Sequence, residues 1–177
     1  LSKEYRESSN SLIFAFIFAL VLIYLVLSAQ FESFLDPLTI MFTVPLALFG
    51  ALFSLWIFDF TLNIFSQIGI IMLIGLVTKN GILIVEFANQ RKETGLEKTQ
   101  AVQEAAVARF RPIIMTSLCT ILGILPIALA LGSGSQSRVS MGIAVVGGML
   151  FSTTLTLYII PAIYSYLSSN RKPVHAE

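Results

Sequence analysis

A lysine in the middle of a long apolar stretch is the residue of this sequence most able to do chemistry. Lys79 lies between two runs of mainly aliphatic residues, 70–77 and 82–85. An ammonium group at the centre of a lipid bilayer costs roughly 2.5–3.5 kcal/mol on insertion scales, so a lysine there is usually paired and usually functional. A lysine that only anchors helix packing through an ion pair is the alternative, and the cost of the buried charge favours function.

The same sequence offers Lys79 no clear acidic partner. Glu86 is seven residues further on and therefore on the same helical face, but it is about 10 Å away along the axis at ~1.5 Å per residue. Glu86 lies near the membrane interface, where a surface carboxylate without a function is as common as a functional one. Asn80 is expected either to hydrogen-bond to another helix or to support looser packing created by Gly75 and Gly81. We therefore expect the acid that pairs with Lys79 to come from elsewhere.

A second line of polar residues follows in the next apolar stretch. Arg109 and Thr116 are seven residues apart, and Thr120 continues close to the same face. Thr116 would lie two turns deeper in the membrane than Arg109, at a depth comparable with Lys79. Pro112 is expected in a first helical turn, where its missing N–H costs little. A threonine hydroxyl can also bond its own helix backbone, so the spacing leaves both interpretations of Thr116 open.

The composition indicates that these residues lie in a membrane protein. Mean hydropathy is +0.86, and 56% of residues are hydrophobic while 12% are charged. Soluble domains have about 45–50% apolar and about 25% charged residues. The charges form short clusters between apolar runs rather than along one face, so the net charge of +1 gives no indication of nucleic-acid binding, and we expect no such partner. The single cysteine, Cys119, excludes a disulfide scaffold, offers no metal-ligand spacing and is expected to be a small buried residue.

The elements that position the polar residues are five predicted transmembrane helices, which makes the fold class an all-α membrane protein. Each apolar stretch is long enough to cross a bilayer, which needs about 20 residues of helix. The predicted spans, which form a membrane domain over 11–167, are 11–30, 37–57, 65–88, 112–131 and 141–167.

Two further patterns refine this arrangement. An apolar stripe over about 95–109 predicts an amphipathic helix along the cytoplasmic membrane surface. Small or hydroxylated residues recur at every fourth position of the fifth span, where helix backbones can approach closely. The residues of this second pattern are Ser140, Ala144, Gly148, Ser152 and Thr156.

The distribution of basic residues predicts the orientation. Five basic residues lie between the third and fourth spans, and Arg171 and Lys172 lie in the tail, 168–177. The positive-inside rule makes that side cytoplasmic and the N-terminus exterior. The chain does not open with Met, so we expect a piece of a longer protein in which 1–10 is the exit segment from a missing exterior domain.

Two other functional classes remain to be compared with a transporter. An intramembrane enzyme is disfavoured because the only histidine, His175, lies in the tail and cannot activate Ser117 or Ser152. A non-transporting membrane anchor or assembly module would use Lys79 only to hold helices together. If the protein is a transporter, loss of Lys79 stops transport. If it is an anchor, loss of Lys79 only lowers stability.

The lysine motif closely resembles a known family. "GLVTKNGILIVEFANQ" and "ARFRPIIMTSLCTILGILPIAL", with "VPLALFGAL" in the second span and "GIAVVGGML" in the fifth, are similar in order and spacing to the C-terminal membrane half of resistance-nodulation-division (RND) efflux transporters. The similarity is best to the multidrug branch typified by AcrB and covers roughly residues 1–167. The Lys-Asn pair argues against the heavy-metal branch.

The resemblance implies more than spacing does. The complete subunit would have twelve spans, of which these five look like the eighth to the twelfth, with periplasmic insertions and a home in the bacterial inner membrane. Lys79 would match a relay lysine that pairs with two aspartates in the missing N-terminal half, and Arg109 and Thr116 would match the relay arginine and threonine. Asn80, Glu86 and Thr120 are possible supporting polar residues.

The resemblance also implies the partners and the energy source. The pump would be a homotrimer that works with a periplasmic adaptor, an outer-membrane channel and membrane lipids. It would be a proton antiporter rather than an enzyme, with protons as the coupling ion and no metal or organic cofactor. A lipid-exporting relative is the closest rival, because the substrate pocket would lie outside this chain.

Overall fold

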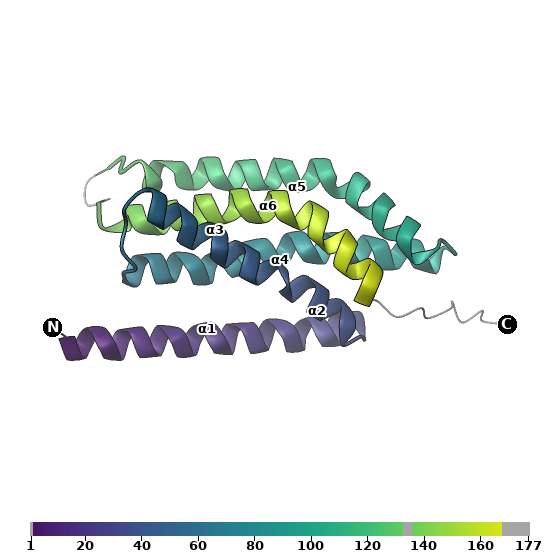
Figure 1. Cartoon of the computed structure of the whole chain (residues 1–177), viewed down its shortest axis with the longest axis horizontal. Coiled ribbons are helices and arrows are strands. Elements are labelled where there is room, and N and C mark those ends of the chain that lie inside the picture. The colour runs from purple at the N-terminus through teal and green to yellow at the C-terminus, as the bar shows by residue number, and fades with distance from the viewer. Residues whose placement is uncertain (1, 133–135, 168–177) are drawn as a thin grey trace.

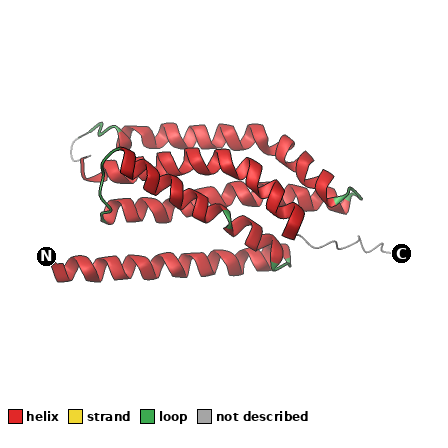
Figure 2. Cartoon of the chain, in the orientation of Figure 1, coloured by secondary structure: helices red, strands yellow, loops and turns green. Residues whose placement is uncertain are grey.

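The structure, a computed structural model, describes residues 2–132 and 136–167 and forms a bundle of long helices (Figure 1). Within those residues the secondary structure is helical without strands (Figure 2). The elements are α1 (Ser2–Phe31), α2 (Leu35–Met41), α3 (Thr43–Ile57), α4 (Ile64–Glu93), α5 (Lys98–Ala128), η1 (Gln136–Arg138) and α6 (Val139–Leu167).

Five stretches are long and apolar enough to cross a membrane, as the sequence predicts. They are Arg6–Phe31, Leu35–Ile57, Ile64–Glu93, Lys98–Ala128 and Val139–Leu167. The all-α membrane class is therefore confirmed. The start of α1, the α3–α4 loop and the start of α6 lie at one end of the bundle, and α2, the α4–α5 loop and the end of α6 at the other (Figure 1).

The structure describes the N-terminal segment of the chain but not the C-terminal tail. Residues 2–10, expected as an exit segment, continue directly into the first span as part of α1. The predicted tail, 168–177, lies outside the described residues, together with Arg171, Lys172 and His175.

The second span is divided into α2 and α3, where the sequence predicts one helix over 37–57. The division falls at Phe42, three residues before Pro45. A proline inside a helix cannot donate to the carbonyl four residues earlier, and its ring crowds that carbonyl. The Thr43 hydroxyl donates to the carbonyl of Ile40 at 2.7 Å, which gives one carbonyl at the break a replacement donor.

The predicted surface helix over 95–109 is not a separate element. It is the first part of α5, which continues through Pro112 to Ala128. Figure 1 shows α5 bending between its ends, and an internal proline is a usual cause of such a bend. Within its apolar stripe, Ala101, Val102 and Ala105 are buried, and Val102 and Ala105 pack in a cluster with residues of α4 and α6. Phe110, at the end of the same stripe, is exposed.

The helix α6 packs against α3, α4 and α5, and its small residues make that possible. Ala144 and Ser152 are fully buried, and a Cβ at Gly148 would overlap the side chain of Leu73 in α4. A Cβ at Gly142 would lie 2.7 Å from the backbone nitrogen of Ala128 in α5. Without hydrogen-bond competition from water, such close backbone approach is a main source of association between membrane helices.

The start of α4 is fixed by a polar cap. Asn63 accepts a hydrogen bond from the backbone N–H of Ser66 at 2.9 Å, and the Ser66 hydroxyl accepts from the backbone N–H of Asn63 at 2.8 Å. This reciprocal capping box satisfies N–H groups at the helix terminus. Ser140 of α6 donates to the same Asn63 oxygen at 2.9 Å, which ties the starts of α4 and α6 together.

By contrast, α1 stands at the edge of the bundle. Only 6% of its apolar window is buried, against 56% for α4. Large side chains such as Phe14, Phe18 and Val26 are exposed along α1. The helix packs chiefly on α2 and α4, so it can shift with little loss of buried surface inside this chain.

We expect Gly142→Ala to destabilise the chain by about 1–3 kcal/mol, because the new methyl group would meet rigid backbone at Ala128. Gly123→Ala in α5 is the matched control, since a Cβ there meets nothing within 4 Å. Thermal unfolding in detergent measures both. Equal stability for the two variants would contradict the close approach of α5 and α6.

Candidate functional site

Lys79 lies in an apolar groove between α1 and α4. The groove has a volume of about 380 Å³. Lys79 is exposed from the bundle and, among the described residues, makes no hydrogen bond or ion pair. The hydroxyl of the neighbouring Thr78 donates a hydrogen bond to the carbonyl of Ile74 at 2.7 Å. The groove walls are formed by Leu22, Ile23, Val26, Leu27, Gly75, Thr78, Ile82 and Leu83.

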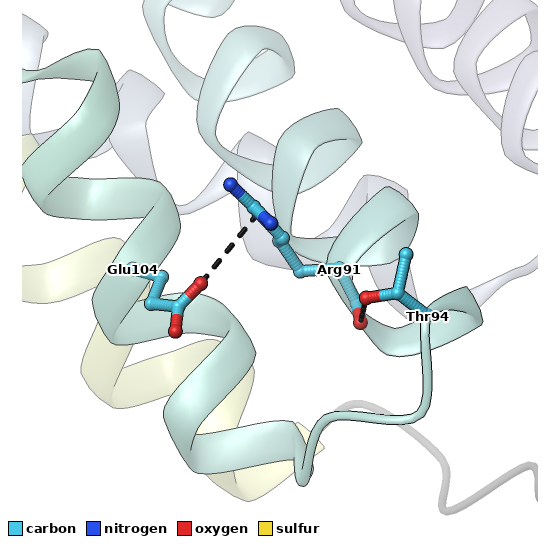
Figure 3. A network of polar contacts seen from close by, with 3 residues as sticks. All are labelled: Arg91, Thr94 and Glu104. Carbon is cyan, nitrogen blue, oxygen red and sulfur yellow. Dashed lines mark hydrogen bonds and ion pairs between the residues drawn. The ribbon is translucent and has the colours of Figure 1, made fainter.

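Acidic residues of the described chain do not reach this groove. Glu86 is exposed on α4 and forms no ion pair with Lys79. An ion pair within the described residues joins Arg91 and Glu104, with Nε and Oε2 3.6 Å apart, where α4 and α5 meet beside their loop (Figure 3). Both side chains are about half exposed, so this pair contributes roughly 0.2–1 kcal/mol. Thr94 closes the same corner by donating to the Arg91 carbonyl at 2.7 Å (Figure 3).

Asn80 hydrogen-bonds across helices, one of the two interpretations that the sequence leaves open. Its Nδ2 donates to the hydroxyl of Ser117 in α5 at 3.4 Å. Thr153 of α6 donates to the same Ser117 oxygen at 3.1 Å. All three side chains are buried. The three residues, which we call the Ser117 network, therefore join α4, α5 and α6 in the interior of the bundle.

The predicted polar residues of α5 have less uniform surroundings. Arg109 is half-buried, its guanidinium carbon lies 5.1 Å from the centre of the Phe87 ring, and its Nε has no hydrogen-bond partner in the described chain. Thr116 is exposed and donates to the Ile113 carbonyl at 3.1 Å, and Thr120 donates to the Thr116 carbonyl at 2.8 Å. Both threonines thus bond their own helix, although each oxygen keeps acceptor capacity.

Helix geometry turns Lys79 and Thr116 toward the same side of the α4–α5 pair. Asn80 and Ser117 face each other across the pair, because they are hydrogen-bonded. One step back along an α-helix is a rotation of about 100°. Since α4 and α5 run in opposite directions (Figure 1), the two backward steps turn Lys79 and Thr116 to the same side of the plane through both axes.

These residues define an open face of the described chain, consisting of Gly75, Lys79, Thr116 and Gly123. Lys79 and Thr116 differ in depth by about 3 Å, one residue's rise on each helix. All four residues are exposed, and a Cβ at either glycine would meet nothing within 4 Å. The open face thus combines an ammonium group and a hydroxyl group with two glycines that leave space beside them.

Sequence reasoning missed a second buried network. Asn89 of α4 donates to the Asp36 carboxylate at 3.1 Å and accepts from the Tyr164 hydroxyl at 2.5 Å. These partners are 53 and 75 residues apart, and no local pattern links them. The only sequence signal was that Asp36 and Asn89 each lie beside apolar residues. Polar residues in the cap of α4 and at the ends of other spans have similar neighbours, so this signal does not single out the pair.

The prediction that Cys119 is a small buried residue is wrong. Cys119 is exposed, because it lies two positions after the inward-facing Ser117 and about 200° around α5. An apolar flank cannot distinguish a residue that faces the bundle from one that faces lipid or a partner. Within the described residues, no group of three or more potential metal ligands occurs.

Together these features define a helical membrane protein with polar networks between its spans and a lysine in a groove at mid-span. The chain belongs to the AcrB/AcrD/AcrF family, whose pattern it matches over residues 1–168. Its resemblance to RND multidrug transporters is confirmed by that membership.

Individual relatives agree with the family assignment. An uncharacterized transporter of Haemophilus influenzae is 42% identical over 180 residues, which cover 98% of this chain and 17% of that protein. The multidrug resistance protein MdtC of Erwinia tasmaniensis is 40% identical, covering 95% of this chain and 16% of that protein. MdtC of Escherichia coli (strain UTI89) is 40% identical, covering 99% and 18%. The chain thus spans less than a fifth of these relatives.

Tyr164→Phe tests the second network. We expect a loss of about 0.5–1.5 kcal/mol of unfolding free energy, because a buried hydrogen bond to Asn89 is removed. Tyr166→Phe is the matched control, since Tyr166 is 89% exposed. Denaturant titration of the solubilised protein measures both variants, and an equal effect in the two would rule out a stabilising role for the network.

Proposed function

We propose that this chain forms part of the membrane domain of a proton-driven multidrug efflux pump, in the bacterial inner membrane with its N-terminus periplasmic. Family membership and the MdtC relatives support the transporter class. The observation that carries the proposal is the position of Lys79. Its ammonium group lies at mid-span on the open face, and no acidic residue of the described chain pairs with it. An uncompensated charge at that depth requires a partner from another part of the protein.

In this proposal an acidic pair on the missing N-terminal half faces Lys79. The ammonium favours the ionised carboxylates, and protonation of the pair removes that attraction. Lys79 then moves toward another acceptor. The groove of about 380 Å³ gives its flexible stem room to do so, and the Thr116 oxygen lies on the same side at a similar depth. One protonation event thereby becomes a change in how two halves of the membrane domain pack.

Arg109 has donor capacity for the same relay. Its Nε is buried and without a hydrogen-bond partner in the described chain, and an unpaired buried donor costs free energy until a partner arrives. An acid or a water chain on the neighbouring half supplies that partner. Glu86 and Thr120 lie on the two helices beside this path and serve as supporting polar groups.

The edge position of α1 suits transmission to the exterior. α1 buries little surface within this chain and forms one wall of the Lys79 groove. Movement of Lys79 therefore acts directly on α1, whose first residues extend toward the exterior domains. The complete pump works as a trimer with a periplasmic adaptor and an outer-membrane channel.

Lys79→Met in the full-length transporter tests the relay. We expect proton-coupled efflux to fall to background while expression and trimer assembly remain, because methionine keeps the stem and removes the charge. Substrate efflux and proton uptake are measured together in proteoliposomes under an imposed pH gradient. Lys98→Met, at the start of α5, is the matched control and keeps transport.

The anchor alternative predicts a different outcome for the same variant. If Lys79→Met lowers thermal stability but leaves efflux per molecule unchanged, the lysine only holds helices together and the relay proposal fails. If the unmutated protein exports phospholipid probes and not drugs, it is instead a lipid exporter.

A further inference from the structure

The Ser117 network differs from the other hydroxyl groups of the bundle in where its hydrogen bonds go. Most described threonine hydroxyls donate to a backbone carbonyl three or four residues earlier in the chain, which is the usual arrangement in membrane helices. These self-bonded threonines are Thr39, Thr43, Thr78, Thr94, Thr116, Thr120 and Thr154. Thr153 instead donates to the side chain of another helix.

Ser117 is the centre on which two donors converge. A hydroxyl oxygen has two lone pairs, and here they accept from Asn80 at 3.4 Å and from Thr153 at 3.1 Å. The three side chains are 3%, 2% and 9% exposed for Ser117, Asn80 and Thr153. The hydrocarbon of a bilayer supplies no water to such groups. Loss of the Ser117 oxygen therefore leaves two buried donors without partners.

The network residues are the direct neighbours of the two groups on the open face. Asn80 follows Lys79 on α4, and Ser117 follows Thr116 on α5. A rotation or a sliding motion of either helix that breaks the Asn80–Ser117 bond moves Lys79 or Thr116 by the same angle or rise. A bond between the inner residues therefore fixes the relative direction and depth of the outer ones.

We infer that Asn80, Ser117 and Thr153 are positioning residues, which lock α4, α5 and α6 in the register that presents Lys79 and Thr116 together on the open face. They touch neither proton nor substrate. Thr153 adds α6, which packs against α3, α4 and α5, so the register includes the helix around which the bundle packs. The register is a property of this chain alone, and its consequence for transport rests on the proposed relay.

A distance measurement tests the register without relying on transport. Spin labels are attached at Lys79→Cys and Thr116→Cys in a Cys119→Ser background, in the full-length protein in liposomes. We expect a narrow distance distribution that broadens or shifts with Ser117→Ala and with Thr153→Val. Thr154→Val is the matched control, because its hydroxyl bonds only its own helix at Leu150, and it leaves the distribution unchanged. An unchanged distribution in both network variants overturns the inference.

A second measurement links the register to function in protein that retains Lys79 and Thr116. We expect Thr153→Val to lower the maximal rate of efflux and to shift its dependence on external pH, and Thr153→Ser, which keeps the hydroxyl, to restore both. A variant that perturbs the spin-label distances but leaves the pH profile of efflux intact overturns the link to transport and keeps the register. If Lys79→Met transports normally, the relay fails while the distance result still decides the inference.

Discussion

A hydroxyl, amide or ammonium group between apolar helices has no water to bond, so each must find its partner on its own helix, on a neighbouring helix or on another part of the protein. The described chain uses all three solutions. Most threonines bond their own backbone, Asn80 and Thr153 meet at Ser117 of a neighbouring helix, and Lys79 has no partner inside the described chain. An unpartnered charge costs the most free energy, so the open face that carries Lys79 is the side of the chain where a partner is needed.

Close packing around α6 is what allows the second solution. Side-chain hydrogen bonds between helices need backbones that approach closely, and the small residues of α6 permit that approach to α4 and α5. The contact of Gly142 with Ala128 and of Gly148 with Leu73 holds α6 where Thr153 can reach Ser117. Packing and polar satisfaction are therefore one arrangement here, since neither the short contacts nor the network would persist alone.

The loose edge of the bundle complements its rigid interior. The buried clusters draw most of their residues from α3, α4, α5 and α6, whereas α1 contributes Leu27 alone to them and leaves an apolar groove at Lys79. A charge held on a rigid helix beside a weakly packed one can convert a local electrostatic change into movement of the weakly packed helix. In the relay that we propose, that combination would couple protonation to the domains outside this chain.

The sequence was enough to predict the five spans and the isolation of Lys79, because hydrophobic length and the absence of a nearby acid are read from consecutive residues. It did not determine the break at Phe42, the continuity of α5 through Pro112, or the outward direction of Cys119. Nor did it identify Ser117 and Thr153, or Asp36 with Asn89 and Tyr164. These features depend on how each helix is rotated against its neighbours, and a rotation of about 100° per residue turns adjacent polar residues to different sides. Only packing between helices distant in sequence fixes that rotation, and with it which polar groups meet inside the bundle and which remain on the open face.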